Sequence, residues 1–250
     1  MGTRLIGIIP ARYASTRFPG KPLALLDGKP MIQHVCEHVA SSTLDQYVVA
    51  TDDERIAQCV RTFGGNVVMT SSSHPSGTDR CGEAADKLGL NDDDVIINIQ
   101  GDEPFISKKE ISLLAGMFHK PEVSIATLVK PIATPQDVQS PNIVKVVIAN
   151  NGKALYFSRL PIPFVRDAGS PPPPYYQHLG IYAYRFRILK KLIQLEPSTL
   201  EKSEKLEQLR WLENGFDIHT AVCDYHGIGI DTQEDLEYVQ SLLSKHNNDL

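Results

Sequence analysis

The chain has no apolar run long enough to cross a membrane. A membrane-spanning helix needs about 20 consecutive apolar residues, and no stretch of the 250-residue sequence comes near that length. The sequence also runs into its first apolar strand without a secretory signal before it. We therefore expect a cytoplasmic protein with no membrane insertion.

Cysteine is scarce and widely spaced. The sequence has four cysteines, Cys36, Cys59, Cys81 and Cys223, and none of them forms a C-x-x-C pair. This spacing argues against a zinc site. Three of the four fall in helical patterns, so we interpret them as core thiols in a reducing compartment.

An excess of positive charge is also missing. The chain has 25 Lys and Arg residues against 30 Asp and Glu residues, which gives a net charge of −5. A nucleic-acid-binding protein would need a basic surface, so we expect no nucleic-acid partner. Basic residues that gather in one loop of such an acidic chain indicate a small anionic ligand.

Several common enzyme motifs are absent. The sequence has no Walker A pattern, no G-x-G-x-x-G, no HExxH and no G-x-S-x-G. These absences argue against kinases, ordinary NAD enzymes, zincins and α/β-hydrolases.

The first half of the sequence alternates between strand and helix patterns. Buried strands are predicted at about 5–9, 47–51, 66–70 and 95–100. Between them, apolar residues at helical spacing predict helices that begin near Pro30, Asp52 and His74. This alternation is typical of a doubly wound, mainly parallel, Rossmann-like α/β sheet.

The second half has a different pattern. Segments 143–148 and 153–157 flank Asn150-Asn151-Gly152, a strong hairpin signal. The remaining elements are predicted, in chain order, as a strand at 180–184, helices at 185–195 and 200–214, a strand at 217–223 and a last helix capped by Thr232 and Asp235. The four prolines at 171–174 are interpreted as a surface loop. We predict a single domain over 1–250 with a smaller hairpin-bearing lobe at about 131–184.

The most informative segment follows the first strand. Residues 9–22 read Ile-Pro-Ala-Arg-Tyr-Ala-Ser-Thr-Arg-Phe-Pro-Gly-Lys-Pro, with cations at Arg12, Arg17 and Lys21. Ligands of open α/β sheets bind past the carboxyl ends of the strands, and three cations with free backbone N–H groups suit a polyphosphate. The alternative is a solvated basic loop, but the prolines, Gly20 and the small hydroxyl residues favour a shaped one.

Two aspartates are candidate metal ligands. Asp102, in Gln100-Gly101-Asp102-Glu103-Pro104, follows the most apolar strand. Mg²⁺ is held by one or two carboxylates, with substrate phosphates and water as its other ligands. Asp231 precedes the last helix and follows a glycine-rich segment. The alternatives are a tight turn at Asp102 and a helix-capping role for Asp231.

Other polar residues are ambiguous by residue type alone. Ser76 to Arg80 fits a base-and-ribose pocket or a capped helix start equally well. Arg159 and His178 stand beside apolar runs, and the pair Glu207-Gln208 fits an ordinary helix surface. Taken singly, each of these residues favours a structural role.

Taken together, these segments resemble a known family. Residues 9–22 are similar to the signature of the sugar nucleotidyltransferases. Five further motifs in order make the chain resemble the 3-deoxy-manno-octulosonate (Kdo) cytidylyltransferases: Ser76–Arg80, Gln100–Pro104, Tyr156–Arg159, His178–Tyr182 and Leu206–Arg210. The likeness covers residues 4 to about 240 and departs mildly at Pro161-Ile162-Pro163 and in the proline run.

The resemblance implies the nucleotide-diphospho-sugar transferase fold and a nucleotidyltransferase that moves CMP from CTP to the anomeric hydroxyl of Kdo. Pyrophosphate would leave, and CMP-Kdo would serve lipopolysaccharide synthesis. The implied nucleotide-binding residues are Ala11, Arg12, Ser15, Arg17, Lys21, Ser76, Arg80 and Gln100. The implied Kdo-binding residues are Arg159, His178, Tyr182, Glu207 and Gln208.

The resemblance also implies a cofactor and a partner. Asp102 and Asp231 would carry Mg²⁺, and with Arg17 and Lys21 they would act in catalysis. A second copy of the chain would pair through the hairpin-bearing lobe to give a homodimer.

Two alternatives remain open at this point. One is a cytidylyltransferase for another sugar acid, such as an acylneuraminate. The other is a non-catalytic nucleotide-binding module on the same fold, which would require Asp102 and Asp231 to be inert. An assay of pyrophosphate release with CTP, Mg²⁺ and each sugar acid separates these hypotheses.

Overall fold

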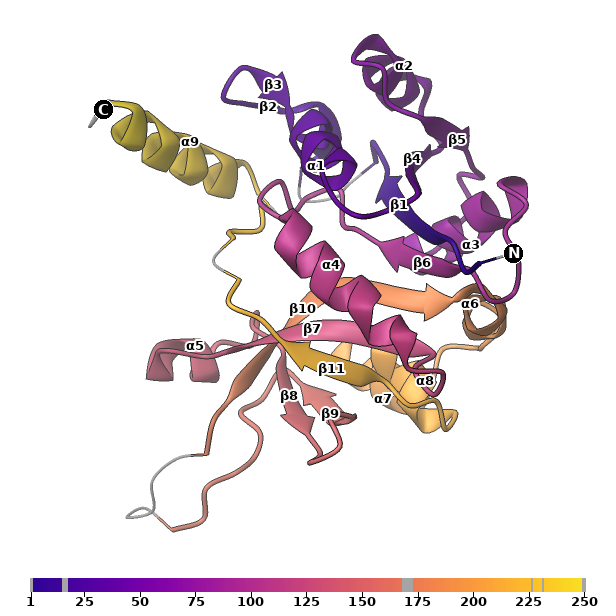
Figure 1. Cartoon of the computed structure of the whole chain (residues 1–250). Coiled ribbons are helices and arrows are strands. Elements are labelled where there is room, and N and C mark those ends of the chain that lie inside the picture. The colour runs from indigo at the N-terminus through magenta and orange to yellow at the C-terminus, as the bar shows by residue number, and fades with distance from the viewer. Residues whose placement is uncertain (1, 15–17, 168–172, 226, 231, 249–250) are drawn as a thin grey trace. The chain divides into compact units, whose positions relative to one another are not determined.

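The computed structural model describes residues 2–14, 18–167, 173–225, 227–230 and 232–248 (Figure 1). The chain divides into two compact units. Unit 1 comprises Met1–Ser112 and His226–Leu250, and unit 2 comprises Leu113–Tyr225. The predicted lobe at about 131–184 falls within unit 2, and the single domain over 1–250 stays a prediction.

Unit 1 alternates strands and helices, as predicted. In chain order its elements are β1 (Leu5–Ala11), the 3-10 helix η1 (Lys21–Leu23), β2 (Leu25–Leu26), β3 (Lys29–Pro30), α1 (Met31–Ala40), β4 (Gln46–Thr51), α2 (Glu54–Thr62), β5 (Val67–Met69), α3 (Gly77–Lys87), β6 (Val95–Asn98) and, after unit 2, α9 (Gln233–Asn248). Helix α4 (Lys108–Gly116) runs across the boundary at Ser112.

The main sheet of unit 1 is parallel, with its strands in the order β6-β1-β4-β5. The register places Ala11, at the carboxyl end of β1, opposite Thr51, at the carboxyl end of β4. Ile6, Ile8 and Ile9 of β1 are fully buried, which is typical of a parallel sheet covered on both faces. The predicted doubly wound, mainly parallel sheet is confirmed.

Local sequence decides where the helices of unit 1 begin and end. The Asp53 carboxylate caps α2 by accepting a hydrogen bond from the Arg55 N–H at 2.9 Å. The Ser76 hydroxyl caps α3 by accepting from the Asp79 N–H at 3.2 Å. After α2, Gly64 takes a φ of 82°, a conformation that favours glycine and ends a helix.

Helix α9 completes the core of unit 1. Thr232 and Asp235 cap it reciprocally, because each backbone N–H donates to the other's side chain, at 2.9 and 3.1 Å. An apolar cluster joins this helix to β2 and α1, and its buried members are Leu26, Met31, Ile230, Leu236 and Val239. Residues near the two ends of the sequence therefore share one core.

Unit 2 contains shorter helices and a mixed sheet. In chain order its elements after α4 are the 3-10 helix η2 (Met117–His119), β7 (Ile125–Pro131), α5 (Pro135–Gln139), β8 (Lys145–Ile148), β9 (Ala154–Ser158), β10 (Tyr176–Arg185), α6 (Phe186–Leu192), α7 (Thr199–Glu204), α8 (Gln208–Glu213) and β11 (His219–Val222).

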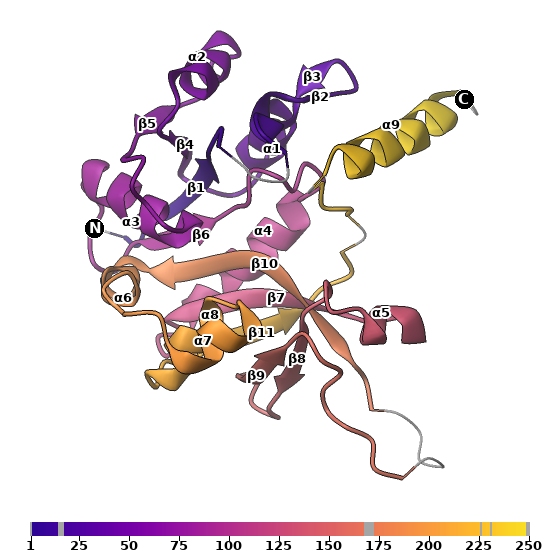
Figure 2. The ribbon, with the colours of Figure 1, turned by 180° about the vertical axis from the view of Figure 1, so that it is seen from behind.

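Strand β7 lies between β11 and β10 in unit 2. It pairs in parallel with β11 and antiparallel with β10. Strand β10 also pairs with β8, and β8 forms the predicted hairpin with β9 (Figure 2). Gly152 in the hairpin turn has a φ of 81°, as the Asn-Gly signal requires. The hairpin is confirmed, whereas the sequence pattern does not predict β7.

The helix predicted at 200–214 is wrong. The chain forms two short helices, α7 and α8, because Lys205 takes a φ of 54° between them. The Glu204 carboxylate accepts hydrogen bonds from the Ser158 hydroxyl at 2.7 Å and from the Arg159 N–H at 2.9 Å. These bonds to the end of β9 hold the last residue of α7 and favour the break.

The four cysteines all lie within the described residues. All four cysteines are free thiols; Cys36, Cys81 and Cys223 are buried, and Cys59 is half-buried. Burial raises the pKa of the Cys36 thiol to about 12, so this thiol stays protonated.

None of the helices within the described ranges combines the length and the apolar character that a membrane span requires.

The proline-rich segment is described only in part. The Ile162–Pro163 peptide bond is cis. Of the four prolines at 171–174, Pro173 and Pro174 are described and precede β10 without regular structure, and the first two lie outside the described residues.

Candidate active site

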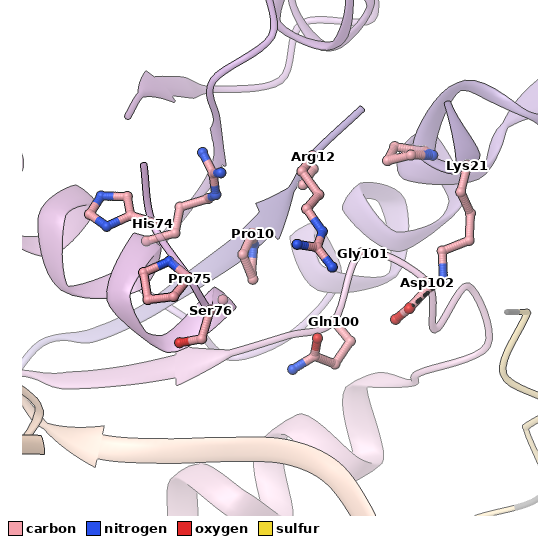
Figure 3. Close-up of a pocket in the computed structure, with 13 residues that line it drawn as sticks. Pro10, Arg12, Lys21, His74, Pro75, Ser76, Gln100, Gly101 and Asp102 are labelled. Atoms are coloured by element: carbon pink, nitrogen blue, oxygen red, sulfur yellow. Dashed lines mark hydrogen bonds and ion pairs between the residues drawn. The ribbon is translucent and has the colours of Figure 1, made fainter. Parts of the chain in front are cut away.

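A pocket of about 210 Å³ opens at the carboxyl edge of the unit 1 sheet (Figure 3). Its lining comes from three parts of the chain: the end of β1 and the segment up to η1, the start of α3 and the segment before it, and the segment after β6. The lining residues are Pro10, Ala11, Arg12, Lys21, Pro22, His74, Pro75, Ser76, Gly77, Arg80, Gln100, Gly101 and Asp102. This edge is where ligands of open α/β sheets bind.

The pocket brings most of the predicted nucleotide-site residues together. Those that line it are Ala11, Arg12, Lys21, Ser76, Arg80, Gln100 and Asp102. The predicted residues Ser15, Arg17 and Asp231 lie outside the described residues. His74, which no role was predicted for, also lines the pocket, and its ring contacts the Glu83 carboxylate.

Opposite charges meet at one end of the pocket. The Lys21 Nζ lies 2.6 Å from Oδ2 of Asp102 (Figure 3). The Asp102 Oδ1 atom has no hydrogen-bond partner within the part of the chain that is described. Arg12 is exposed and points toward Gly101 (Figure 3). Two cations and one carboxylate oxygen are therefore directed at the same space.

The two ends of the basic loop are held together by Tyr13 and Gly20. The Gly20 N–H donates to the Tyr13 carbonyl at 2.9 Å. Gly20 has a φ of 73°, and a Cβ at this position would lie 3.1 Å from the Tyr13 ring. The Arg55 guanidinium carbon stacks 3.3 Å from the ring centroid. This packing fixes where Arg12 and Lys21 enter and leave the loop.

Gly20→Ala is therefore expected to raise the KM for the nucleotide about tenfold more than a control that shares only the positive φ, because its added Cβ pushes on Tyr13 and shifts the loop that carries Arg12 and Lys21. Gly28→Ala is the matched control, since Gly28 has a φ of 75° with nothing within 4 Å of its Cβ position. Steady-state kinetics measure both variants. Equal KM values for the two would contradict a specific role of the Tyr13–Gly20 contact.

Arg80 is a buried cation on the pocket wall. Its Nη1 donates to the Thr70 hydroxyl at 2.6 Å, and its Nη2 lies 3.2 Å from Oδ1 of Asp52. These contacts come from the chain after β5 and after β4, and they fix the guanidinium plane. Arg80 can be identified from its sequence motif, whereas Asp52 and Thr70 cannot, because only the fold brings the three residues together.

A second group of predicted residues lies in unit 2, where Tyr182 and Gln208 are buried and His178 is half-buried. The His178 ring contacts Phe157 and Tyr182, with ring centroids 5.0 and 5.2 Å away. The Thr127 hydroxyl donates to the Ile181 carbonyl at 2.7 Å, so it accepts from His178 Nε2 at 3.1 Å. This assignment places the imidazole proton on Nε2 and leaves Nδ1 as an acceptor.

Burial sets the ionisation of these side chains. It lowers the pKa of His178 to about 3, and it raises the pKa of Tyr182 well above its usual value, with Glu207 nearby adding to the effect. Both groups are neutral at pH 7. Tyr182 Oη and Gln208 Nε2 are buried without a hydrogen-bond partner in the described ranges, as polar groups that bind a ligand would be.

His178 should make the protein less stable as the pH falls. Its pKa is about 3 in the folded chain and about 6.5 when unfolded. The stabilisation is complete above pH 6.5 and is lost as the pH falls toward 3, by at most about 2 kcal/mol between pH 6.5 and 5. We expect the melting temperature of His178→Gln to fall less from pH 7 to pH 5 than that of the unmodified chain. The exposed His119→Gln variant is the control, and an equal fall in all three proteins would contradict the role of His178.

Arg159 lies at the end of β9 with a fixed side chain. Its Nε donates to the Glu204 carbonyl at 2.7 Å, its Nη1 to the Pro141 carbonyl at 3.0 Å and its Nη2 to the Lys205 carbonyl at 3.4 Å. A guanidinium has five N–H groups. Two of them therefore have no partner within the described chain, and they are available to an anion.

The described residues hold no cluster of three or more His, Cys, Asp or Glu side chains that would bind a metal ion without substrate. A Mg²⁺ site does not require one, since one or two carboxylates with substrate phosphates suffice. Asp102 meets that requirement for one of the two predicted ligands.

The chain is similar to known proteins along most of its length. Residues 6–218 match the cytidylyltransferase family. A 3-deoxy-manno-octulosonate cytidylyltransferase from Parabacteroides distasonis is 52% identical over 96% of this chain and 98% of its own length. The corresponding protein of Thermodesulfovibrio yellowstonii is 51% identical over 97% and 99%.

Solved structures give the same picture. A CMP:2-keto-3-deoxy-manno-octonic acid synthetase complexed with CTP superposes with a TM-score of 0.91 at 43% identity, covering 98% of this chain and 100% of that one. A cytidylyltransferase from Leptospira borgpetersenii superposes with a TM-score of 0.64 at 17% identity, covering 98% and 88%. The second likeness supports the fold alone.

Proposed function

The chain belongs to the cytidylyltransferase family and, within it, to the Kdo cytidylyltransferases, and we propose that it transfers CMP from CTP to the anomeric hydroxyl of Kdo. The anomeric oxygen forms a bond to the α-phosphorus of CTP and loses its proton. The bond from that phosphorus to the bridging oxygen breaks, and pyrophosphate leaves. The product, CMP-Kdo, is the activated sugar for lipopolysaccharide synthesis.

One observation carries this proposal. Arg12, Lys21 and Asp102 are directed at one pocket at the carboxyl edge of a parallel sheet, in a chain about half identical to Kdo cytidylyltransferases along nearly its whole length. A non-catalytic nucleotide module would not need a carboxylate among the phosphate-binding cations. The relatives also favour Kdo over an acylneuraminate as the sugar acid.

The residues of the pocket have separate tasks in this reaction. Lys21 and Arg12, with Arg17 and Ser15 of the same loop, bind the triphosphate and neutralise the charge that develops on the leaving pyrophosphate. Arg80, held by Asp52 and Thr70, reads the cytosine with Gln100. Ala11 and Ser76 border the nucleoside. Positioning and charge neutralisation are what a phosphoryl displacement needs.

Mg²⁺ is the proposed cofactor, with Asp102 and Asp231 as its protein ligands. Asp102 fits this role, because Lys21 occupies Oδ2 while Oδ1 has no partner in the described chain. The N–H of Ile230 donates to the Asp102 carbonyl at 3.3 Å, so the residue that directly precedes Asp231 in the sequence contacts Asp102. When bound, the ion neutralises charge on the α-phosphate and on the attacking oxygen.

Kdo is proposed to bind the polar residues of unit 2. Its carboxylate suits the two remaining N–H groups of Arg159. Its hydroxyl groups suit the buried Tyr182 Oη and Gln208 Nε2, which have no partner within the described residues. His178 stays neutral and offers Nδ1 as an acceptor. Glu207 completes the predicted set.

Pyrophosphate release tests the function. The protein is incubated with CTP and Mg²⁺, and with Kdo, an acylneuraminate or no sugar acid. We expect pyrophosphate release with Kdo but not with the acylneuraminate or without a sugar acid. Chelation of the divalent ion should abolish this release. Equal release with the acylneuraminate, or none with either sugar, would contradict the assignment.

Two further expectations concern the setting of the enzyme. We propose a homodimer that pairs through the hairpin-bearing lobe at about 131–184, and a cytoplasmic location, where CTP is available. Sedimentation equilibrium tests the first. A mass of one chain, 27.7 kDa, at micromolar concentration would contradict it.

A further inference from the structure

Lys145 is a fully buried cation that the reaction described above does not use. It begins β8, and its side chain has no exposed surface. Its Nζ donates to the Ser140 carbonyl at 2.8 Å and to the Arg159 carbonyl. A buried ammonium is costly unless it is well bonded, and an apolar side chain of similar volume would often serve stability as well. A role beyond stability is therefore worth seeking.

The contacts of Lys145 lead to the proposed Kdo-binding arginine. Lys145 holds the Arg159 carbonyl, and the Glu204 carboxylate accepts from the Arg159 backbone N–H at 2.9 Å. The backbone of Arg159 is thus held on both sides. Its guanidinium is held in turn by carbonyls of Pro141 and Glu204.

The chain segments in this network are distant in sequence. Residues 140–141 precede β8, residues 158–159 are the last residue of β9 and the one after it, and residues 204–205 are the last residue of α7 and the one after it. Lys145 joins the first segment to the second through its two carbonyl acceptors, and Glu204 joins the second to the third. Arg159 is the residue on which all three segments converge.

The charge of this network favours an anion. Lys145 and Arg159 are cations, and Glu204 is the carboxylate that acts on Lys145 electrostatically, so the three groups sum to one positive charge. Two N–H groups of Arg159 remain without partners in the described chain. A carboxylate bound there would neutralise the excess charge and use both donors.

We propose that Lys145 is a positioning residue for substrate recognition: with Glu204, it fixes Arg159 so that two guanidinium N–H groups face the carboxylate of the sugar acid. This role rests on the proposed function and extends it to a residue that does not touch substrate. Because Lys145 acts through Arg159, its loss weakens binding of the sugar acid and leaves CTP binding intact.

Lys145→Met tests the proposal, since methionine is similar in length and lacks the charge and the donors. We expect the KM for Kdo to rise about tenfold, with the KM for CTP and kcat within about threefold of the unmodified enzyme. Lys153→Met is the matched control, because Lys153 lies at the turn of the same hairpin and pairs with Asp217 at 2.6 Å. If Lys145→Met does not fold, Glu204→Gln serves as a second variant. It is expected to raise the KM for Kdo in the same selective way.

A double-mutant cycle separates positioning from plain stability. Lys145→Met is introduced into the Arg159→Ala background and the KM for Kdo is measured again. A residue that acts through Arg159 should add less than about twofold there. A merely structural residue would add its full effect, and it would raise the KM values for CTP and Kdo alike.

The outcomes distinguish the proposal from the function on which it rests. No Kdo-dependent pyrophosphate release by the unmodified chain would overturn the function. Release with an unchanged KM for Kdo in both Lys145→Met and Glu204→Gln, beside a raised KM in Arg159→Ala, would overturn only the positioning role. An unchanged KM in Arg159→Ala would overturn the binding role of Arg159 and the positioning role with it.

Discussion

Asp102→Asn is expected to lower kcat about a hundredfold or more while changing the affinity for CTP by less than about threefold. The amide keeps the volume of the carboxylate and can still accept a hydrogen bond from Lys21, which lies 2.6 Å away. It lacks the negative charge that a divalent ion requires. The loss therefore falls on the displacement step rather than on nucleotide binding.

Single-turnover kinetics at saturating Mg²⁺, together with equilibrium binding of CTP, measure the two effects of Asp102→Asn separately. Asp27→Asn is a suitable control, because it is the same substitution of a carboxylate by an amide at an exposed residue, in the turn between β2 and β3. Unchanged turnover in Asp102→Asn would contradict the metal-binding role of Asp102. A loss of CTP affinity as large as the loss of turnover would show that Asp102 acts mainly in binding.

Arg159→Ala should raise the KM for Kdo between about tenfold and a hundredfold, because hydrogen bonds to charged groups contribute about 1.5–3 kcal/mol. The KM for CTP should not change, since the three contacts of the guanidinium are all with carbonyls of unit 2. Arg159→Lys keeps the charge but not the planar pair of donors. We expect the KM of Arg159→Lys for Kdo to lie between that of the unmodified enzyme and that of Arg159→Ala.

Initial rates over a matrix of CTP and Kdo concentrations give both constants for the Arg159 variants. Arg187→Ala, which removes an exposed arginine from α6, controls for the loss of a positive charge. An effect of Arg159→Ala confined to CTP would refute its assignment to the sugar acid.

Much of unit 1 is predictable because its signals are local. The run Val95–Ile97 is apolar, and the whole strand Val95–Asn98 is buried, as a central parallel strand must be. Shortly after it, Gln100, Gly101 and Asp102 line the pocket, because parallel strands end at one edge of the sheet. The hairpin at Asn150 to Gly152 is predictable for a similar reason, since its turn chemistry fixes the backbone.

The errors arise where distant contacts decide the structure. The break at Lys205 depends on bonds from Glu204 to residues about 45 positions earlier, and no local pattern announces it. Strand β7 carries a polar Thr127 at its centre, whose hydroxyl is satisfied by carbonyls of β10. Periodicity detects neither, because it considers one segment at a time.

The same limit applies to the site. Arg80 and Arg159 can be identified from their motifs, but the groups that fix their positions cannot. Asp52 belongs to the segment after β4, and Lys145 to a strand that the sequence predicts only as one arm of a hairpin. Residues that support a site from elsewhere in the sequence become visible only once the fold is known.

The position of α9 bears on how the protein is synthesised. A nascent chain usually folds its amino-terminal part first, yet the core of unit 1 includes Ile230, Leu236 and Val239. All of unit 2 must leave the ribosome before these residues do. Unit 2 is contiguous and can fold while translation continues, whereas the first part of unit 1 must wait, with Leu26 and Met31 uncovered, until the last helix emerges. A ribosome stalled before Ile230 should therefore display a nucleotide pocket that binds CTP poorly.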